Sequence, residues 1–236
     1  MVAEDREAAM RVGVSPSQEG KGSPAAVRLA DCMEAVQNLD ASALETALVR
    51  ASIDLPTPAL LEQVLLPLLR EVGEQWQTGE LRVAHEHMAT AIVRSFLGTQ
   101  QNGRHSEESA PEIIVATPSG QRHELGGLMV SVVAAADGWR VTYLGSDLPA
   151  EDIAATALRR RARAVALSIV YPADDPRVEE QIRELGSLLP PEVKVLAGGL
   201  SAKGYSKALD TIGAIRVNSL PDLRTRLAEI RTSPDA

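Results

Sequence analysis

The second half of the chain alternates short apolar runs with longer helical stretches, and this alternation constrains the fold more than any other feature. Short apolar runs, most of them rich in β-branched residues, predict strands at 112–117, 140–144, 164–170, 193–197 and 214–217. The helical stretches lie at 124–137, 150–163, 176–189, 203–212 and 221–231. Nearly continuous apolar strands must be covered on both faces. The pattern predicts an α/β domain with a Rossmann-like, flavodoxin-like sheet of five parallel strands.

The first part of the chain carries a helical pattern instead, with apolar residues every three or four positions. In the first helix these are Ala26, Leu29, Ala30, Met33 and Val36, and in the fourth they are Met88, Ala91, Ile92, Ser95 and Phe96. Asp40 and Thr57 stand where caps of the second and third helices are expected, and Pro67 is expected to bend the third. Four helices joined by short loops predict an antiparallel four-helix bundle.

Composition divides the chain into segments. The stretch 13–24 holds Gly, Ser, Pro, Gln and Lys with hardly an apolar side chain, and residues 1–22 are predicted to form a disordered tail. Residues 23–101 form the predicted bundle, which caps the following domain, and the polar stretch 102–111 is the predicted linker. The Rossmann-like domain is then expected over 112–236.

Charge and cysteine content exclude several classes of protein. Lys and Arg number 24 against 32 Asp and Glu, for a net charge of −8, which argues against direct DNA binding. A single cysteine, Cys32, excludes an internal disulfide and a multi-cysteine metal centre within one chain. No apolar run is long enough to span a membrane and no signal peptide is evident, so a cytoplasmic location is expected.

Polar and glycine residues stand where several predicted strands end. His123 follows the first strand, Ser168 lies near the end of the third, and Gly198-Gly199 follow the fourth. In parallel sheets these carboxyl ends share one edge, where ligands bind. No dinucleotide-binding G-x-G-x-x-G or phosphate-binding G-x-x-x-x-G-K-[ST] motif is present, so nucleotide binding is not indicated.

Three motifs in order carry a family resemblance. They are Gln121-Arg122-His123-Glu124-Leu125-Gly126, then Ser168-Ile169-Val170, then Gly198-Gly199. This series resembles the cobalamin-binding domains of methionine synthase, corrinoid proteins and the CarH/LitR photoreceptors, whose pattern is Asp/Glu-x-His-x-x-Gly, Ser-x-Leu/Val and Gly-Gly. The resemblance covers about residues 24–230, and the preceding bundle also resembles the cap found in many members.

The resemblance implies roles for the motif residues. His123 becomes the lower axial ligand of the cobalt in cobalamin, a metal that imidazole binds well. Ser168 would hydrogen-bond the displaced nucleotide tail, and the glycine pair would let the backbone approach that tail. Gln121 replaces the family's carboxylate, which holds the ligand histidine through its second nitrogen, and an uncharged amide is expected to leave the imidazole a weaker ligand.

A further pattern in the bundle resembles the light-sensing branch. Trp76 is followed after nine residues by Glu86-His87, like the residues that pack around the adenosyl group of adenosylcobalamin in CarH/LitR proteins. In the CarH branch a histidine follows the tryptophan, whereas here Gln77 does. His85 and His87 are then the only bundle histidines that could replace it.

These resemblances imply a sensor or binding protein rather than an enzyme. We expect light to break the Co–C bond and thereby change domain packing, oligomeric state or the binding of a protein output partner, in a homo-oligomeric protein. The DNA-binding head of CarH is not expected, and in this respect the chain resembles the stand-alone photocobilins. That resemblance implies biliverdin as a possible second cofactor, bound without a covalent bond. Two alternatives stay open, namely a corrinoid shuttle protein of a methyltransferase system and a flavodoxin-like regulatory domain without cobalamin.

Overall fold

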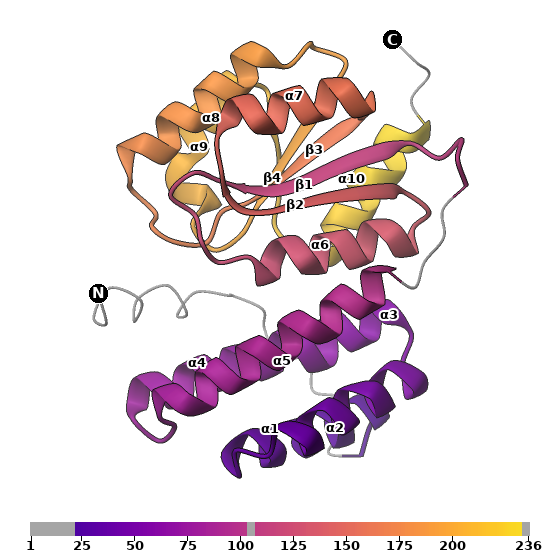
Figure 1. The fold of residues 1–236 in the computed structure, drawn as a ribbon, viewed down its shortest axis with the longest axis vertical. Coiled ribbons are helices and arrows are strands. Elements are labelled where there is room, and N and C mark those ends of the chain that lie inside the picture. Colours follow the sequence, from indigo (N-terminus) through magenta and orange to yellow (C-terminus); the bar gives the residue numbers. More distant parts are fainter. Residues whose placement is uncertain (1–21, 103–106, 233–236) are drawn as a thin grey trace. The chain divides into compact units, whose positions relative to one another are not determined.

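The computed structural model describes residues 22–102 and 107–232 and divides into two compact units, Met1–Thr99 and Gln100–Ala236 (Figure 1). The predicted tail 1–22 therefore lies outside the described residues except for Gly22. The predicted linker 102–111 begins just after the unit boundary, and its residues 103–106 are also outside the description. Each unit is considered by itself below.

The second unit is built on one parallel sheet, and this confirms the predicted fold class. Its strands are β1 (Glu112–Pro118), β2 (Arg140–Leu148), β3 (Ala164–Ser168), β4 (Lys194–Gly198) and β5 (Ile215–Val217). Their order is β2-β1-β3-β4-β5, and every pairing is parallel. This is the flavodoxin-like order. All residues of β1 and β3 are buried, as the continuous apolar runs predicted.

Helices cover both faces of this sheet (Figure 1). One face carries α6 (Leu125–Ala136) and α10 (Leu220–Thr232), and the other carries α7 (Ala150–Arg160), α8 (Pro176–Leu188) and α9 (Ser206–Thr211). A 3₁₀ turn, η4 (Ala202–Tyr205), precedes α9. The strand after α6 is β2 on one side of β1, whereas the strand after α7 is β3 on the other side. The chain therefore reverses direction between β1 and β3, which makes their carboxyl ends the switch point.

The first unit consists of helices, as predicted. They are α1 (Pro24–Gln37), α2 (Ala41–Asp54), a continuous helix made of α3 (Thr57–Ala59), η3 (Leu60–Leu65) and α4 (Leu66–Thr78), and α5 (Val83–Asn102). Ser23 and Asp40 cap α1 and α2 by accepting backbone N–H bonds from Ala26 and Ala43. Gly79 ends α4 in the left-handed conformation, with φ of 83°.

Details of the third helix differ from the expectation. Thr57 is the first helical residue and makes no side-chain cap, because Pro56 occupies the cap position. A π-helical segment, in which Leu66 N–H donates to the Leu61 carbonyl, precedes Pro67. Proline has no N–H and its ring crowds the carbonyl four residues earlier, so a widened turn accommodates it inside the helix.

The buried stripes of two helices also differ from the prediction. Ala30, Ala91 and Ser95 are exposed, although they fit a three-and-four spacing. In α5 the buried side chains are Ala89, Ile92, Val93, Phe96 and Leu97, so the buried face is rotated by about one residue from the predicted one. Small residues such as Ala and Ser carry little weight in such a pattern because their burial releases little free energy.

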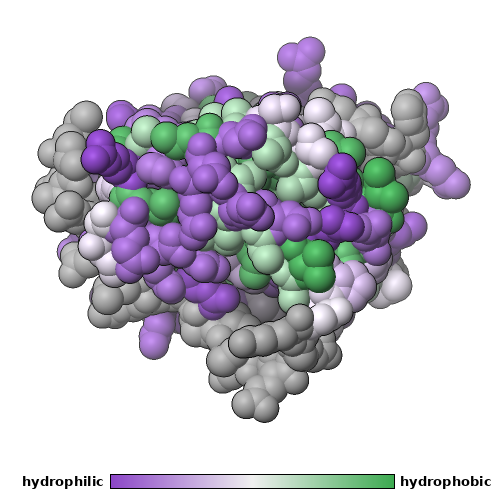
Figure 2. Space-filling model, turned by 90° about the horizontal axis from the view of Figure 1, so that it is seen from below, coloured by the Kyte–Doolittle hydropathy of each residue, from purple (hydrophilic) through white to green (hydrophobic). Residues whose placement is uncertain are grey.

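Exposed apolar side chains remain on the helical unit, among them Val27, Val49 and Ile53. On the face drawn in Figure 2, hydrophobic residues form several separate groups surrounded by hydrophilic ones. Scattered apolar surface of this kind is normal for folded proteins. Within the described residues, no helix has the length and apolar character needed to cross a bilayer.

The amino edge of the sheet is held by a buried carboxylate. Glu112 begins β1 and is 3% exposed. Its side chain accepts hydrogen bonds from Arg140, from Thr142 Oγ1 at 2.7 Å and from Arg160 Nε at 2.5 Å. Although burial raises the pKa of Glu112, the hydrogen bonds from Arg160, Arg140 and Thr142 outweigh it and leave that pKa below its usual value. Arg160 is thus engaged in an ion pair with Glu112.

This cluster predicts a pH dependence of stability. Because the folded pKa of Glu112 lies below its unfolded value, its contribution is complete above the unfolded pKa and is lost as pH falls through the folded pKa. We expect Glu112→Gln to lower the free energy of unfolding at pH 7 by about 1–3 kcal/mol. The penalty should shrink as pH falls below about 4, as measured by urea denaturation at several pH values. An equal penalty at every pH would contradict the charged role.

Candidate functional site

His123 lies at the switch point, on the segment between β1 and α6, and its side chain is exposed. The segment after β3 approaches it, because the ring centroids of His123 and Tyr171 are 6.2 Å apart and meet edge to face at 87°. Tyr171 was not among the sequence-based candidates, since an aromatic residue after a strand carries no motif. The edge-on contact brings together two loops that are 48 residues apart in sequence.

Gln121 connects the same two loops through its side chain and is fully buried. Its Oε1 accepts the backbone N–H groups of Val170 at 2.8 Å and Tyr171 at 2.9 Å, and its Nε2 donates to the Pro172 carbonyl at 3.1 Å. The amide is therefore occupied by the loop after β3 instead of by the imidazole of His123, which was its expected partner. The physical reason is that this loop presents two donors and one acceptor, a set that an amide matches.

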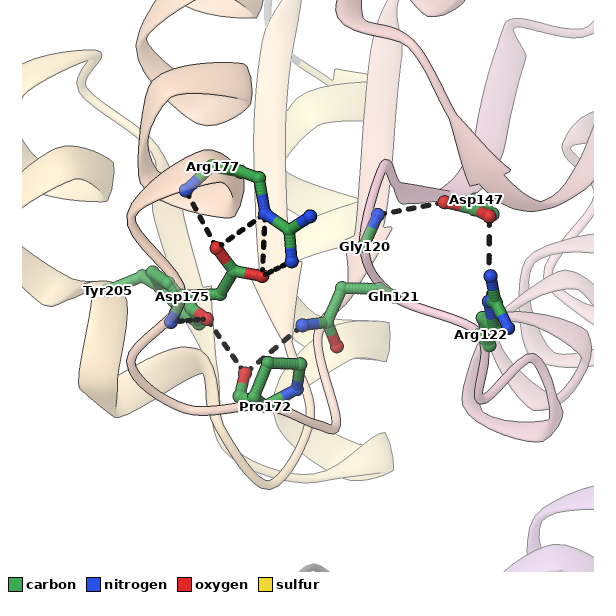
Figure 3. A network of polar contacts seen from close by, with 8 residues as sticks. All are labelled: Gly120, Gln121, Arg122, Asp147, Pro172, Asp175, Arg177 and Tyr205. Atoms are coloured by element: carbon green, nitrogen blue, oxygen red, sulfur yellow. Dashed lines mark hydrogen bonds and ion pairs between the residues drawn. The ribbon is translucent and has the colours of Figure 1, made fainter. Parts of the chain in front are cut away.

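The backbone around Gln121 is held from the other side by the ends of β1 and β2. The Gln121 carbonyl accepts hydrogen bonds from Thr117 Oγ1 and from the N–H of Asp147, the latter at 3.1 Å. Asp147 Oδ1 in turn accepts the Gly120 N–H at 2.8 Å, and its Oδ2 lies 3.7 Å from Arg122 Nε (Figure 3). The carboxylate of Asp147 thus fixes the turn that precedes His123.

The loop after β3 is also anchored towards β4. Ser201 Oγ donates to the Val170 carbonyl at 2.6 Å, and the Tyr205 hydroxyl donates to the Pro172 carbonyl at 2.8 Å while accepting the Asp175 N–H at 3.0 Å (Figure 3). Burial raises the pKa of Tyr205, so its hydroxyl keeps the proton that it donates. The carboxyl ends of β2, β1, β3 and β4 therefore share one hydrogen-bonded network, which we call the rim network.

Asp175 closes this network at the start of α8. Its carboxylate accepts the Arg177 N–H at 2.9 Å as the helix cap and also pairs with the Arg177 guanidinium (Figure 3). The hydrogen bond from the Arg177 side chain is the largest cause of the lowered pKa of Asp175. This charged cap fixes the direction in which α8 leaves the rim.

Gly126 and Ser168 lie against each other. A Cβ atom at Gly126 would stand 2.5 Å from Ser168 Oγ, so only glycine lets the first turn of α6 pack over this serine. Ser168 is 5% exposed. At the next position, a Cβ on Gly127 would lie 3.3 Å from the Tyr143 ring. The two glycines therefore let the start of α6 pack closely against Ser168 and Tyr143.

The glycine pair after β4 has a reason inside the protein. A Cβ at Gly198 would lie 2.9 Å from the Val217 carbonyl oxygen. Gly199 has φ of 110°, and a Cβ there would overlap the Ile169 carbonyl and lie 2.9 Å from the Ile169 nitrogen. Both glycines therefore permit close packing of neighbouring backbone. The approach to the nucleotide tail that the resemblance implies for them stays a prediction.

The bundle candidates lie on two consecutive helices of the first unit. Trp76, near the end of α4, is half-buried. Near the start of α5, Glu86 Oε2 lies 2.5 Å from His87 Nδ1, and Glu86 Oε1 accepts a hydrogen bond from Thr90 at 2.9 Å. The His87 side chain is 75% exposed, so its ring is accessible. His85 Nδ1 accepts the Arg82 N–H at 3.1 Å, which makes it a local cap of α5.

The structure thus groups seven sequence candidates at one rim of the α/β unit, from Gln121 through Gly199, and places the other three in the helical unit. The rim also includes residues that sequence reasoning missed, namely Thr117, Asp147, Tyr171, Ser201 and Tyr205. No group of three or more His, Cys, Asp or Glu side chains within residues 22–102 and 107–232 is placed to hold a bare metal ion. A single histidine at the switch point suits a metal ion whose other coordination positions are filled by the cofactor that contains it.

Comparison with known families agrees with this geometry. Residues 111–217 match the B12 binding domain family, and residues 29–99 match a second B12 binding domain family. Each of the two units thus contains a match to a B12 binding domain family. The chain belongs to this family of B12-binding proteins.

Among curated relatives, the chain is similar to the HTH-type transcriptional repressor CarA of Myxococcus xanthus, with 31% identity over 228 residues, 96% of this chain and 76% of that protein. It is also 31% identical to the HTH-type transcriptional repressor CarH of the same organism, over 76% of this chain and 60% of that protein. Trimethylamine corrinoid protein 1 of Methanosarcina acetivorans is 27% identical, over 69% of this chain and 76% of its own length. These relatives place the chain close to the CarH-like branch.

A solved structure shares the fold. The monomethylamine corrinoid protein of Methanosarcina barkeri matches with a TM-score of 0.70 at 16% identity, over 86% of this chain and 98% of that chain. The likeness supports the predicted combination of helices and a Rossmann-like domain.

The close backbone approach at Gly199 predicts a large effect of a single methyl group. Gly199→Ala should lower the free energy of unfolding by about 3 kcal/mol or more, because strain at positive φ adds to overlap with Ile169. Gly213→Ala is the matched control, since Gly213 has φ of 66° with open space around it, and should cost about 1 kcal/mol. Urea denaturation measures both. Similar losses in the two variants would contradict the role of the Ile169 contact.

Proposed function

We propose that the chain is a cobalamin-dependent light sensor that takes adenosylcobalamin and has His123 as the lower ligand of the cobalt. The observation that carries this proposal is the place of His123, exposed at the switch point on a loop that both neighbouring strands hold. A ligand histidine must be accessible and also pre-oriented, and this combination meets both needs. The similarity to CarA and CarH supports the light-sensing branch.

The residues of the α/β unit divide the work of binding. His123 donates an imidazole nitrogen to cobalt, and the edge of Tyr171 limits the rotation of its ring. Ser168, whose hydroxyl packs against Gly126, would hydrogen-bond the nucleotide tail. The N–H and carbonyl of Val170 are bound by Gln121 and Ser201, so the backbone of Val170 holds the loop after β3 in place. When bound, adenosylcobalamin supplies a Co–C bond that visible light breaks.

By the resemblance to the CarH/LitR branch, Trp76, Glu86 and His87 of the helical unit would contact the adenosyl group. Trp76 offers apolar area, and Glu86-His87 offer a hydrogen-bonding pair that is already formed. Loss of the adenosyl group would remove these contacts and so shift the equilibrium between two arrangements of the protein. This shift would change the oligomeric state or the affinity for a protein output partner in the cytoplasm.

A bilin such as biliverdin would be held without a covalent bond. Cys32 is the only cysteine in the chain and is fully buried in α1. Burial raises the pKa of the Cys32 thiol to about 12, so the nucleophilic thiolate is scarce at neutral pH. Any bilin in the purified protein should therefore separate from the chain on denaturation.

A second candidate is a corrinoid shuttle protein, which the similarity to trimethylamine corrinoid protein 1 supports. Such a protein would carry a methyl group between partner enzymes and need an open upper side. The two candidates share His123 and differ in the role of Trp76, Glu86 and His87. Replacing these three residues should matter for a sensor and leave methyl transfer with a partner enzyme intact.

The test loads the purified full chain with adenosylcobalamin and records its absorption spectrum before and after green light, with and without biliverdin. We expect the spectrum to change on illumination and to stay constant in the dark, while light scattering reports a change of molecular mass. His123→Ala serves as the reference for lost imidazole ligation, and its dark spectrum should differ from that of the unsubstituted protein.

Three outcomes separate the candidates. A spectrum that does not respond to light rejects the sensor. Binding of methylcobalamin with no preference for the adenosyl form, together with methyl transfer to a partner enzyme, favours the shuttle. Identical dark spectra for His123→Ala and the unsubstituted protein reject His123 as the ligand.

A further inference from the structure

We infer that Gln121 is a positioning residue for His123 that acts through the loop after β3, and that the amide group itself is required there instead of the carboxylate found in the family pattern. This inference rests on the proposed function, because it concerns the histidine assigned to cobalt. It assigns a role to the position within the three motifs of the α/β unit at which the chain departs from the family pattern. A direct effect of charge on the imidazole would predict that a carboxylate at position 121 strengthens cobalt binding, whereas this inference predicts that it weakens binding.

The geometry fixes the orientation of the amide. Val170 N–H and Tyr171 N–H both require an acceptor, which Oε1 provides, while the Pro172 carbonyl requires a donor, which Nε2 provides. With the amide group turned over, all three contacts would become unfavourable. Because Gln121 is fully buried, water cannot easily replace any of them.

A carboxylate fits this set of partners poorly. It could accept the N–H groups of Val170 and Tyr171, but its second oxygen would face the Pro172 carbonyl oxygen without a proton between them. The Pro172 carbonyl would then keep only the bond from the Tyr205 hydroxyl. Burying a negative charge at a fully enclosed position adds a desolvation cost. The side chain at position 121 and the loop after β3 therefore form a matched pair.

The effect of the Gln121 side chain reaches His123 along the backbone, since only Arg122 separates the two residues. Gln121 stands two residues before His123, and its carbonyl is held by Thr117 and Asp147 on the opposite side from its side chain. The turn is therefore fixed both towards β2 and towards β3. The loop after β3 in turn carries Tyr171, whose ring meets the His123 ring edge to face. Releasing the Gln121 amide would loosen the backbone that carries the histidine and the aromatic ring that limits its rotation.

The test uses two substitutions at position 121 and matched substitutions elsewhere. Gln121→Met keeps the shape of the side chain and removes all three hydrogen bonds, whereas Gln121→Glu restores the carboxylate of the family pattern. Gln181 is the matched position, because its Oε1 accepts the Ala150 N–H at 2.8 Å and its Nε2 donates to Glu184 at 2.9 Å. Gln181→Met removes both bonds, whereas Gln181→Glu keeps an acceptor for the Ala150 N–H and loses the donor to Glu184, and neither partner belongs to the rim network.

We expect two effects of the changes at position 121. In the cofactor-free chain, hydrogen exchange of the Val170 and Tyr171 amides should rise about tenfold in Gln121→Met. In the loaded protein, both Gln121→Met and Gln121→Glu should weaken cobalamin binding by about 10- to 100-fold and shift the absorption spectrum towards that of His123→Ala. The Gln181 variants should leave the spectrum and these amides unchanged.

The opposite results would overturn the inference. If Gln121→Glu binds cobalamin more tightly or keeps the spectrum of the unsubstituted protein while His123→Ala loses it, a charged partner is compatible and the amide is not required. Unchanged exchange of Val170 and Tyr171 in Gln121→Met would remove the connection between the loops. A spectrum of His123→Ala equal to that of the unsubstituted protein is a different failure, since it rejects His123 as ligand and thereby the proposed function.

Discussion

The buried amide of Gln121 is the interaction on which the arrangement of the rim depends. A parallel sheet leaves the last N–H and carbonyl groups of its strands without partners at the carboxyl edge. In this chain the Gln121 side chain satisfies three such groups of the loop after β3. The backbone carbonyl of Gln121 accepts two further hydrogen bonds from the ends of β1 and β2. The backbone that carries His123, two residues further on, is thereby fixed, although the His123 ring is exposed.

The sheet could be predicted from the sequence because its signals are local. Apolar runs separated by helical stretches give strand positions to within a few residues, and their alternation with helices requires parallel pairing. The strand β3 ends at Ser168, two residues before the predicted end, because the next N–H groups bind Gly198 and Gln121 instead of continuing the ladder with β1. The predicted stripe of α5 was less accurate, since Ala91 and Ser95 satisfy the spacing without being buried.

The site could be predicted only where a motif supplied it. His123, Ser168 and the glycine pair follow from family resemblance together with the rule that ligands meet strand ends. The partners of Gln121 lie 49 to 51 residues away, so no local pattern indicates them. The atoms that exclude a Cβ at Gly198 and Gly199 belong to Val217 and Ile169, which only the folded structure brings near.

A rim that is fully hydrogen-bonded before any cofactor arrives also bears on how a signal could arise. Gln121, Ser201 and Tyr205 already form hydrogen bonds with the backbone of the loop after β3. Ordering this loop on binding therefore costs little conformational entropy, which favours a higher affinity. The same rigidity means that the rim has little freedom to change when the upper ligand is lost. A sensor needs an element whose equilibrium differs between the two ligation states. On the proposed function that element would lie outside the rim network, and an exposed side chain such as His87 would suit it because it has few contacts to break.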